Sequence, residues 1–507
     1  MLPISKTTFL QFQICPKDTW LRLHKPGLVE KFVLTEFEKH LLEQGNEVEE
    51  KARQLFPNAV LVSATGDEAL EKTRRLMAAG TEAIFQATFL ADGFFCKCDV
   101  LKPGAEPGSW NVFEIKGTNS KKEGSEDRDH ISDLAFQKHV LELAGVTVGR
   151  THIIHLNKEY VRAGPLNVQS LFIIDDSSEQ VAAAAAGLLE EMHAARHYLN
   201  RADEPNIGCD CHLSGRSRHC RTFSYSHPEI PEYSVHDIVR IGQSKKKLEY
   251  FMDEHIFVID EVPDDFKLGA AQELQVRAHK KQEPIIVRDA IAEILGAYVF
   301  PLYFLDYETY APAIPAFDTY SPYQRIPFQF SLHILRDKDG EPEHVEFLHR
   351  DRSDPTATVA ELLGRHIDPK GTVVVWYAPF ERGVNEEIGG RLLRFASQME
   401  RINGQVKDLR DVFAEQHYIH PDFRGSTSIK AVMPVLVPEL SYDDLEIKEG
   451  ATASEQWWKM TAENTPAGER ERVVAALLAY CGLDSYAMYA IWKKLHQVVE
   501  GTPSVTP

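Results

Sequence analysis

The sequence predicts a mixed α/β protein that folds as two domains, residues 1–225 and 296–500, joined by a connector over residues 226–295. A chain of 507 residues exceeds what one hydrophobic core usually serves. In each half, short apolar stretches typical of strands alternate with stretches of helical pattern. The hydrophobic and charged shares, 43% and 26%, are those of an ordered globular protein. We therefore expect two separate cores, each built from strands and helices.

The first half contains a predicted helix and a predicted strand hairpin. Residues 34–55 follow a helical pattern, and residues 93–101 and 110–116 are apolar strands separated by a turn rich in Pro and Gly. Asp99 lies near the end of one strand, and period-2 alternation places Glu114 and Lys116 on one face of the next. Two carboxylates can hold a divalent cation there, while the lysine adds positive charge where negative charge develops on a phosphorane.

The second half begins with a predicted meander of three strands, residues 299–306, 326–335 and 343–348. Asp306 ends the first of these strands, and Glu308 shares its face. Residues 371–377 form a buried strand that leads into Glu381 at the start of a helix. The last predicted helix, residues 469–499, carries Tyr480 and Asp484 one turn apart on one face. These acids have the spacing of a second metal site.

Four of the seven cysteines form a pattern in which Cys15 precedes Cys209, Cys211 and Cys220 by about 200 residues. Grouped cysteines in a cytosolic chain bind metal more often than they form disulfides. Four thiolates can hold a [4Fe-4S] cluster or a zinc ion, with His212 or His219 as possible zinc ligands. Inert free cysteines are the third possibility. A metal centre would tie the N-terminus to residue 220 and close the first domain.

The net charge of −20 argues against tight, indiscriminate coating of duplex nucleic acid. It does not exclude a nucleic-acid enzyme, because clustered carboxylates are what Mg²⁺ or Mn²⁺ requires and local basic stretches can supply a positive track. The N-terminus lacks the pattern of a secretion signal, and no apolar run approaches the length of a membrane span. We expect a cytoplasmic protein without membrane contact.

The first half, residues 1–225, resembles the RecB-like branch of the PD-(D/E)xK nucleases, in particular its iron-sulfur members with four cysteines. The resemblance rests on Asp99, Glu114-Ile-Lys116, the flanking helices and the cysteines. It implies that Asp99 and Glu114 bind metal and that Lys116 is catalytic. It also implies that Glu50 is a helical acid near the metal and that Gln137 supports the site. The chain departs from the family at Glu49, where histidine is common, and at Leu141, where tyrosine is common.

The second half, residues 296–500, resembles the DEDD exonucleases of the ribonuclease H-like fold, in the variant with a Tyr-x3-Asp motif. The resemblance implies that Asp306, Glu308 and Asp484 bind two divalent ions and that Tyr480 orients the attacking water. Glu381 stands where the family has aspartate, and Asp408 and Asp411 are the alternative ligands. The polar and aromatic segment 418–430 is expected either to pack as a long loop or to grip a strand end. In the second case Arg424 and Lys430 would bind phosphate, and Tyr418 or Phe423 would stack on a base.

The whole chain also resembles an uncharacterised bacterial family, a domain of unknown function fused to a RecB-type nuclease. We expect a metal-dependent exonuclease that hydrolyses DNA from single-stranded ends in repair or in defence against foreign DNA. The chain has no Gly-x4-Gly-Lys-Ser/Thr motif, so it would use frayed ends or a partner such as a helicase or another repair or defence protein. An RNA exonuclease is one alternative. The other is a catalytically degenerate, nucleic-acid-binding subunit of a helicase or defence complex.

Overall fold

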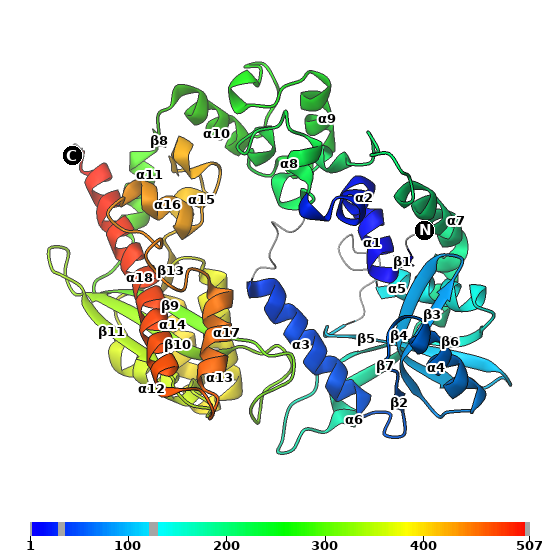
Figure 1. The fold of residues 1–507 in the computed structure, drawn as a ribbon. Coiled ribbons are helices and arrows are strands. Elements are labelled where there is room, and N and C mark those ends of the chain that lie inside the picture. Colours follow the sequence, from blue (N-terminus) through cyan, green and yellow to red (C-terminus); the bar gives the residue numbers. More distant parts are fainter. Residues whose placement is uncertain (1–2, 29–35, 121–129, 502–507) are drawn as a thin grey trace. The chain divides into compact units, whose positions relative to one another are not determined.

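A computed structural model describes residues 3–28, 36–120 and 130–501 (Figure 1). Residues 34 and 35 of the first predicted helix lie outside this range. The chain forms two compact units, each a mixed α/β structure, which confirms the predicted fold class at that level. Unit 1 comprises Met1–His212, Arg218–Pro228 and Pro312–Tyr323, and unit 2 comprises Leu213–Ser217, Glu229–Ala311 and Gln324–Pro507. Most of the predicted connector therefore falls in unit 2.

Unit 1 is built on a seven-stranded sheet in the order β2-β3-β4-β5-β6-β7, with β1 added parallel to β4. The predicted hairpin is the antiparallel pair β4–β5, and α5 connects β5 to the parallel strand β6. The strands are β1 (Ile4–Ser5), β2 (Val60–Leu61), β3 (Ile84–Ala91), β4 (Phe94–Pro103), β5 (Ser109–Lys116), β6 (Thr147–Leu156) and β7 (Phe172–Asp176). The helices are α1 (Lys6–Ile14), α2 (Pro16–His24), α3 (Glu36–Arg53), α4 (Gly66–Ala78), α5 (His130–Leu143), α6 (Val168–Leu171), α7 (Ser178–Leu199) and α8 (Phe223–Ser226).

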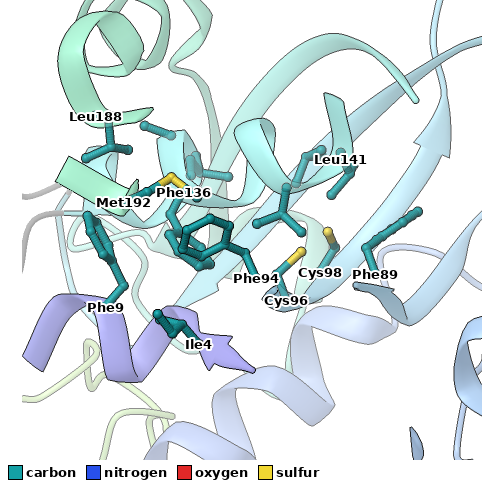
Figure 2. Close-up of a cluster of buried hydrophobic side chains, with 14 of the residues drawn as sticks. Ile4, Phe9, Phe89, Phe94, Cys96, Cys98, Phe136, Leu141, Leu188 and Met192 are labelled. Carbon is teal, nitrogen blue, oxygen red and sulfur yellow. The ribbon is translucent and has the colours of Figure 1, made fainter. Parts of the chain in front are cut away.

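Two hydrophobic cores cover the two faces of this sheet. On one face, residues of α1, α2, α4, α5 and α7 pack against the strands, and Figure 2 shows Phe9, Phe94 and Phe136 at the centre of that core. On the other face, α3 packs through Val48 and Ala52, together with Ala313 and Ile314 of the segment Pro312–Tyr323. Because both faces are covered, consecutive residues of β4 are buried on opposite sides, with Val100 in one core and Leu101 in the other.

Unit 2 is built on a five-stranded sheet in the order β11-β10-β9-β12-β13. The strands β9, β10 and β11 form the predicted antiparallel meander, whereas β12 and β13 run parallel to β9. The strands are β9 (Leu302–Tyr310), β10 (Ile326–Leu335), β11 (Glu343–Leu348), β12 (Thr372–Val375) and β13 (Val406–Asp408), with a separate pair of β8 (Ile285–Ile286) and β14 (Tyr418–Ile419). The helices are α9 (Lys245–Asp253), α10 (Ala270–Lys281), α11 (Arg288–Gly296), α12 (Thr356–His366), α13 (Ala378–Arg391), α14 (Ala396–Gln405), α15 (Asp411–Ala414), α16 (Ile429–Leu436), α17 (Gly450–Met460) and α18 (Ala467–Val499).

Alternation along β9 directs successive side chains to opposite faces of the sheet. Tyr303, Leu305 and Tyr307 enter the core formed with α12, α13 and α14. Phe304 faces the other way and meets Tyr489 and Trp492 of α18. Because the period is two, Asp306 and Glu308 point to the α18 side.

The helix α18 is the one described helix that is long and apolar enough to cross a membrane. Of its most apolar 18-residue window, 61% is buried inside the fold. The buried side chains include Asp484 and Ser485, which is the pattern of a core helix that carries polar groups to a site.

Candidate functional site

Three carboxylates from two elements meet in unit 2. Asp306 and Glu308 come from the same face of β9, and Asp484 comes from α18. One carboxylate oxygen of each lies within 4.8 Å of those of the other two, so the three can share a metal ion. This group, which we refer to as the acidic triad, brings Asp484 together with two acids that lie far from it in the sequence.

The triad concentrates negative charge in a buried place. Burial, together with Asp484 and Glu308, raises the pKa of Asp306 well above its usual range. Burial and Asp484 act in the same way on the pKa of Glu308. The pKa of Asp484 rises to about 6 through burial, although the Tyr442 hydroxyl and Lys430 favour its charged form. A divalent cation would relieve this repulsion.

Two tyrosines and a lysine surround the triad. The Tyr442 hydroxyl donates a hydrogen bond to Oδ1 of Asp484. Tyr480, one turn before Asp484, interacts with the same carboxylate. The Lys430 ammonium of α16 lies 5.6 Å and 5.7 Å from the ring centroids of Tyr442 and Tyr480 and donates to the carbonyl oxygen of Lys448. The structure thus brings the predicted residues Tyr480 and Lys430 to the triad.

Glu381 lies in the first turn of α13 and is only 4% exposed. Its Oε2 has no hydrogen-bond partner among the described residues, and burial raises its pKa to about 8. Its charge contributes to the raised pKa of Asp306, so Glu381 lies near the triad. It is not one of the three acids whose oxygen atoms lie within 4.8 Å of one another. It remains available for a ligand that approaches the triad.

Asp408, one alternative to Glu381, is committed to the backbone. Its carboxylate accepts from the amides of Tyr377, Ala378 and Arg410 at 3.2, 2.8 and 3.0 Å, which caps the start of α13 and the turn after β13. Asp411 is the other alternative to Glu381 as a metal ligand. Burial and the neighbouring carboxylate of Asp408 raise the pKa of Asp411.

Tyr377, which lies between β12 and α13, has a strained backbone. Its backbone φ is +120°, a value that residues other than glycine rarely adopt. Its side chain is nevertheless 51% exposed. The Arg410 guanidinium lies 5.5 Å from the Tyr377 ring centroid. An exposed aromatic ring held in a costly conformation beside an arginine points to a role outside packing.

The segment 418–430 divides into a packed part and a part near the triad. Tyr418 and Phe423 are 7% and 4% exposed and both contact Phe413, so they serve packing and are not open to a base. Arg424 lies 5.5 Å from the ring centroid of Tyr233. Within this segment, Lys430 is the residue whose charge acts on Glu308 and Asp484.

In unit 1, the predicted residues Asp99, Glu114 and Lys116 also come together. Asp99 Oδ2 accepts from the amide of Ile115 at 2.8 Å, and Lys116 Nζ donates to Glu114 Oε1 at 3.0 Å. Gln137, as expected from its place on α5, donates to the other oxygen of Glu114 at 2.6 Å. The four residues therefore share one polar group on β4, β5 and α5.

Two residues that the sequence did not indicate complete this group. Lys6 of α1 donates to Glu114 Oε1 at 2.5 Å, and Asp133 of α5 pairs with Lys116. Burial alone would raise the pKa of Glu114, but Lys116 and Lys6 together hold it below its usual value. By contrast, burial and Glu114 raise the pKa of Asp99. In contrast with the triad, Glu114 is already neutralised by neighbouring lysines.

The acid of α3 that approaches this group is Glu49. Glu49 accepts from Gln86 Nε2 at 2.7 Å, and Gln86 reaches Asp99 Oδ1 at 3.4 Å. Glu50, which the family resemblance places near the metal, is exposed. Neighbouring helical residues point about 100° apart, so an assignment one residue off moves a side chain away from a site.

The four predicted cysteines also come together, in unit 1. Their sulfur atoms all lie within 4.8 Å of one another, and Cys209 Sγ is 3.6 Å from Cys220 Sγ. Cys15 lies between α1 and α2 and accepts from the amide of Asp18 at 3.4 Å. Hydrogen bonds from the neighbouring thiols lower the pKa of Cys209, which favours a thiolate. This group can hold metal, as the sequence predicted.

A comparison with protein families matches residues 303–428 to a model described as a domain of unknown function (DUF2779). The match begins within β9 and ends before α16, so it includes Asp306, Glu308 and Glu381 but not Asp484. Neither the curated proteins nor the solved structures include a match to the chain.

Proposed function

We propose that the chain is a metal-dependent nuclease that hydrolyses phosphodiester bonds of DNA from single-stranded ends. The observation that carries the proposal is the acidic triad. Burial raises the pKa of all three carboxylates, and the neighbouring acids raise those of Asp306 and Glu308 further, so the group gains from binding divalent cations. Mg²⁺ or Mn²⁺ takes oxygen ligands of this kind.

The architecture around the triad supports the same proposal. An antiparallel meander, a parallel strand after a helix, and a terminal helix that carries an acid follow the order of the ribonuclease H-like exonucleases. In that fold, acids from the first strand and the last helix bind the metals. Asp306, Glu308 and Asp484 occupy these positions here.

The residues around the triad have distinct roles in the proposed reaction. When bound, divalent ions would polarise the phosphate and lower the pKa of the attacking water. Burial and Asp484 raise the pKa of Tyr480, so its phenol keeps its proton and can orient that water by hydrogen bonding. Lys430 adds positive charge beside Glu308 and Asp484, where a phosphate oxygen would lie.

Tyr377 and Arg410 provide the grip on the strand end in this proposal. The strand β12, which Tyr377 follows, runs parallel to β9 and is hydrogen-bonded to it, so Tyr377 lies at the strand end nearest Asp306. An exposed tyrosine ring can stack on a base of any sequence, and a guanidinium can pair with the adjacent phosphate. Recognition of this type suits an exonuclease that acts on ends without regard to sequence.

The group of Asp99, Glu114 and Lys116 is proposed as a second nuclease site of the PD-(D/E)xK type. Asp133 Oδ1 and Gln137 Oε1 are buried and lack hydrogen-bond partners among the described residues, which suits a site that takes a further polar ligand. Lys6 on Glu114 favours the alternative in which this group binds nucleic acid without cleaving it. The chain would then cleave only in unit 2.

The test uses the full chain, purified without oxygen, with end-labelled single-stranded DNA and RNA of one sequence in Mn²⁺. We expect release of nucleotides by the wild type, loss of release in Asp306→Asn, and unchanged release in Asp444→Asn, which removes an exposed acid of the same unit. Lys116→Ala tests the group in unit 1 separately. Release from RNA alone would make the chain an RNA exonuclease.

Absence of release from both polymers would refute the nuclease proposal. If the same protein nevertheless retained labelled ends in a filter-binding assay, the result would favour the nucleic-acid-binding subunit. We further propose a cytoplasmic location, a partner helicase that supplies single-stranded ends, and a role in repair or defence against foreign DNA.

A further inference from the structure

We infer that the four cysteines hold a single metal ion, zinc by its ligand chemistry, in place of the [4Fe-4S] cluster that the family resemblance implies. The inference rests on the distances between the sulfur atoms and on the hydrogen bonds that fix their positions. It is independent of the proposed nuclease activity.

The sulfur distances match a tetrahedral ion. Zinc lies about 2.3 Å from each thiolate, so two thiolates of one tetrahedron are separated by about 3.8 Å. The observed separation of Cys209 Sγ and Cys220 Sγ is 3.6 Å, and all four sulfur atoms lie within 4.8 Å of one another. An ion at their centre would have the coordination number that structural zinc prefers.

A four-iron cube requires a wider arrangement. Each thiolate then binds a different iron at a different corner, and the cube itself separates the sulfur atoms. To accept the cube, Cys220 would have to move away from Cys209 and Cys15. The structure opposes that movement, because a buried aspartate holds the segment that contains Cys220 in place.

Asp18 is that aspartate, and it is fully buried in the first turn of α2, three residues after Cys15. Its Oδ1 accepts from both the amide and the hydroxyl of Thr222, at 3.0 and 2.9 Å. Its Oδ2 accepts from Gln11 Nε2 at 3.1 Å and pairs with Arg22 at 2.7 Å. These bonds fix Cys220, two residues before Thr222, against α2, which carries Cys15 at its N-terminus.

The two histidines considered as alternative ligands have other contacts. His212 Nδ1 is 3.0 Å from the carbonyl oxygen of Cys209. The His219 ring stacks on Phe223 with the centroids 3.5 Å apart. The ligand set is therefore the four thiolates, and a soft set of four thiolates in a tetrahedron suits zinc.

Cys96 and Cys98 provide the internal comparison. Both lie on β4 within the hydrophobic core, where Figure 2 shows them near Phe89, Phe94 and Leu141. They are buried among apolar side chains and behave as small hydrophobic residues. Cys96→Ala is therefore the matched control for a substitution among the four cysteines.

The experiment measures metal and acid-labile sulfide in the full chain, produced in cells supplied with both iron and zinc and purified without oxygen. We expect about one zinc ion per chain in the wild type and in Cys96→Ala, at least a tenfold lower zinc content in Cys220→Ala after dialysis, and negligible iron. If Cys220→Ala does not fold, exchange of Co²⁺ into the wild type decides, because a tetrahedral thiolate site gives intense visible bands.

Iron and sulfide in equal amounts, with visible absorption that bleaches on reduction, would overturn the inference. Wild-type protein free of metal that also fails to bind Co²⁺ would overturn it as well. Iron incorporated only by reconstitution in excess, and displaced by stoichiometric zinc, would support the single-ion site.

Discussion

The acidic triad makes an unusual prediction about stability: removal of a proposed metal ligand should stabilise the metal-free protein. Asp484 is buried near Asp306 and Glu308, and its pKa rises from 3.8 to about 6. Asp484→Asn keeps the shape and can still accept the hydrogen bond from Tyr442. It removes the charge that burial and repulsion disfavour.

The sign follows from proton binding. A carboxyl group with a raised pKa in the folded state binds its proton more tightly there than in the unfolded chain. Its contribution to stability is present below the unfolded pKa of 3.8 and is lost as the pH rises through about 6. A rise of roughly 2 pH units corresponds to at most roughly 3 kcal/mol. At roughly 2–4 °C per kcal/mol, Asp484→Asn should melt up to roughly 6–12 °C above the wild type at pH 8.

The assay is thermal melting of the full chain in EDTA at pH 8 and at pH 4, then at pH 8 with Mn²⁺. The advantage of Asp484→Asn should be present at pH 8 and nearly absent at pH 4, where both proteins are neutral at this position. Mn²⁺ should raise the melting temperature of the wild type more than that of the variant. Asp408→Ala is the control, because it removes a backbone cap and should lower the melting temperature at pH 8 while leaving the Mn²⁺ response intact.

Equal or lower melting of Asp484→Asn at pH 8 would refute this reasoning about the triad. So would an advantage of the same size at both pH values, since that would indicate better packing and not relief of charge.

Three further predictions concern other residues. Tyr480→Phe should lower kcat roughly 10² to 10⁴-fold with little change in KM, measured by nucleotide release, because the phenol orients water without binding the strand; an unchanged kcat would remove Tyr480 from the reaction. Tyr377→Gly should stabilise unit 2 by about 1 kcal/mol, because glycine tolerates φ of +120°, and it should weaken the binding of single-stranded DNA. Thermal melting measures the first effect, and fluorescence anisotropy in Ca²⁺ measures the second. DNA binding as tight as that of the wild type would exclude the stacking role. Asp18→Ala should destabilise unit 1 by about 3 kcal/mol, because Thr222 and Arg22 lose a buried partner, as melting would show; a loss below about 1 kcal/mol would mean that Cys220 is held by other contacts.

Sequence patterns predicted the strands of this protein better than the contacts of its polar residues. The strands 326–335 and 343–348 were predicted with the observed bounds. The strand with Asp306 continues to Tyr310, because pairing of Tyr310 with Ile326 extends the ladder. Alternation of apolar residues reports burial on a face, but it does not report where a partner strand ends.

The predicted groupings of distant residues succeeded where the residue types were specific to a chemistry. The four cysteines and the three acids each come together as expected. Lys6 and Tyr442 were missed because a lone lysine or tyrosine has no such specificity. Lys6 reaches Glu114 across 108 residues, and Tyr442 reaches Asp484 across 42. A single sequence contains no record of contacts at these separations.

The division of the chain between its units has a consequence for modularity. The segment Pro312–Tyr323 follows β9 directly, yet it completes unit 1: Ala313 and Ile314 enter a core of that unit, and Arg162 donates to the carbonyl oxygens of Pro315 and Ala316. The chain passes between units after residues 212, 217, 228, 311 and 323. A single cut, whether by a protease or by a recombination event, therefore cannot yield two complete halves. Neither unit can be inherited or exchanged as one continuous piece of the gene.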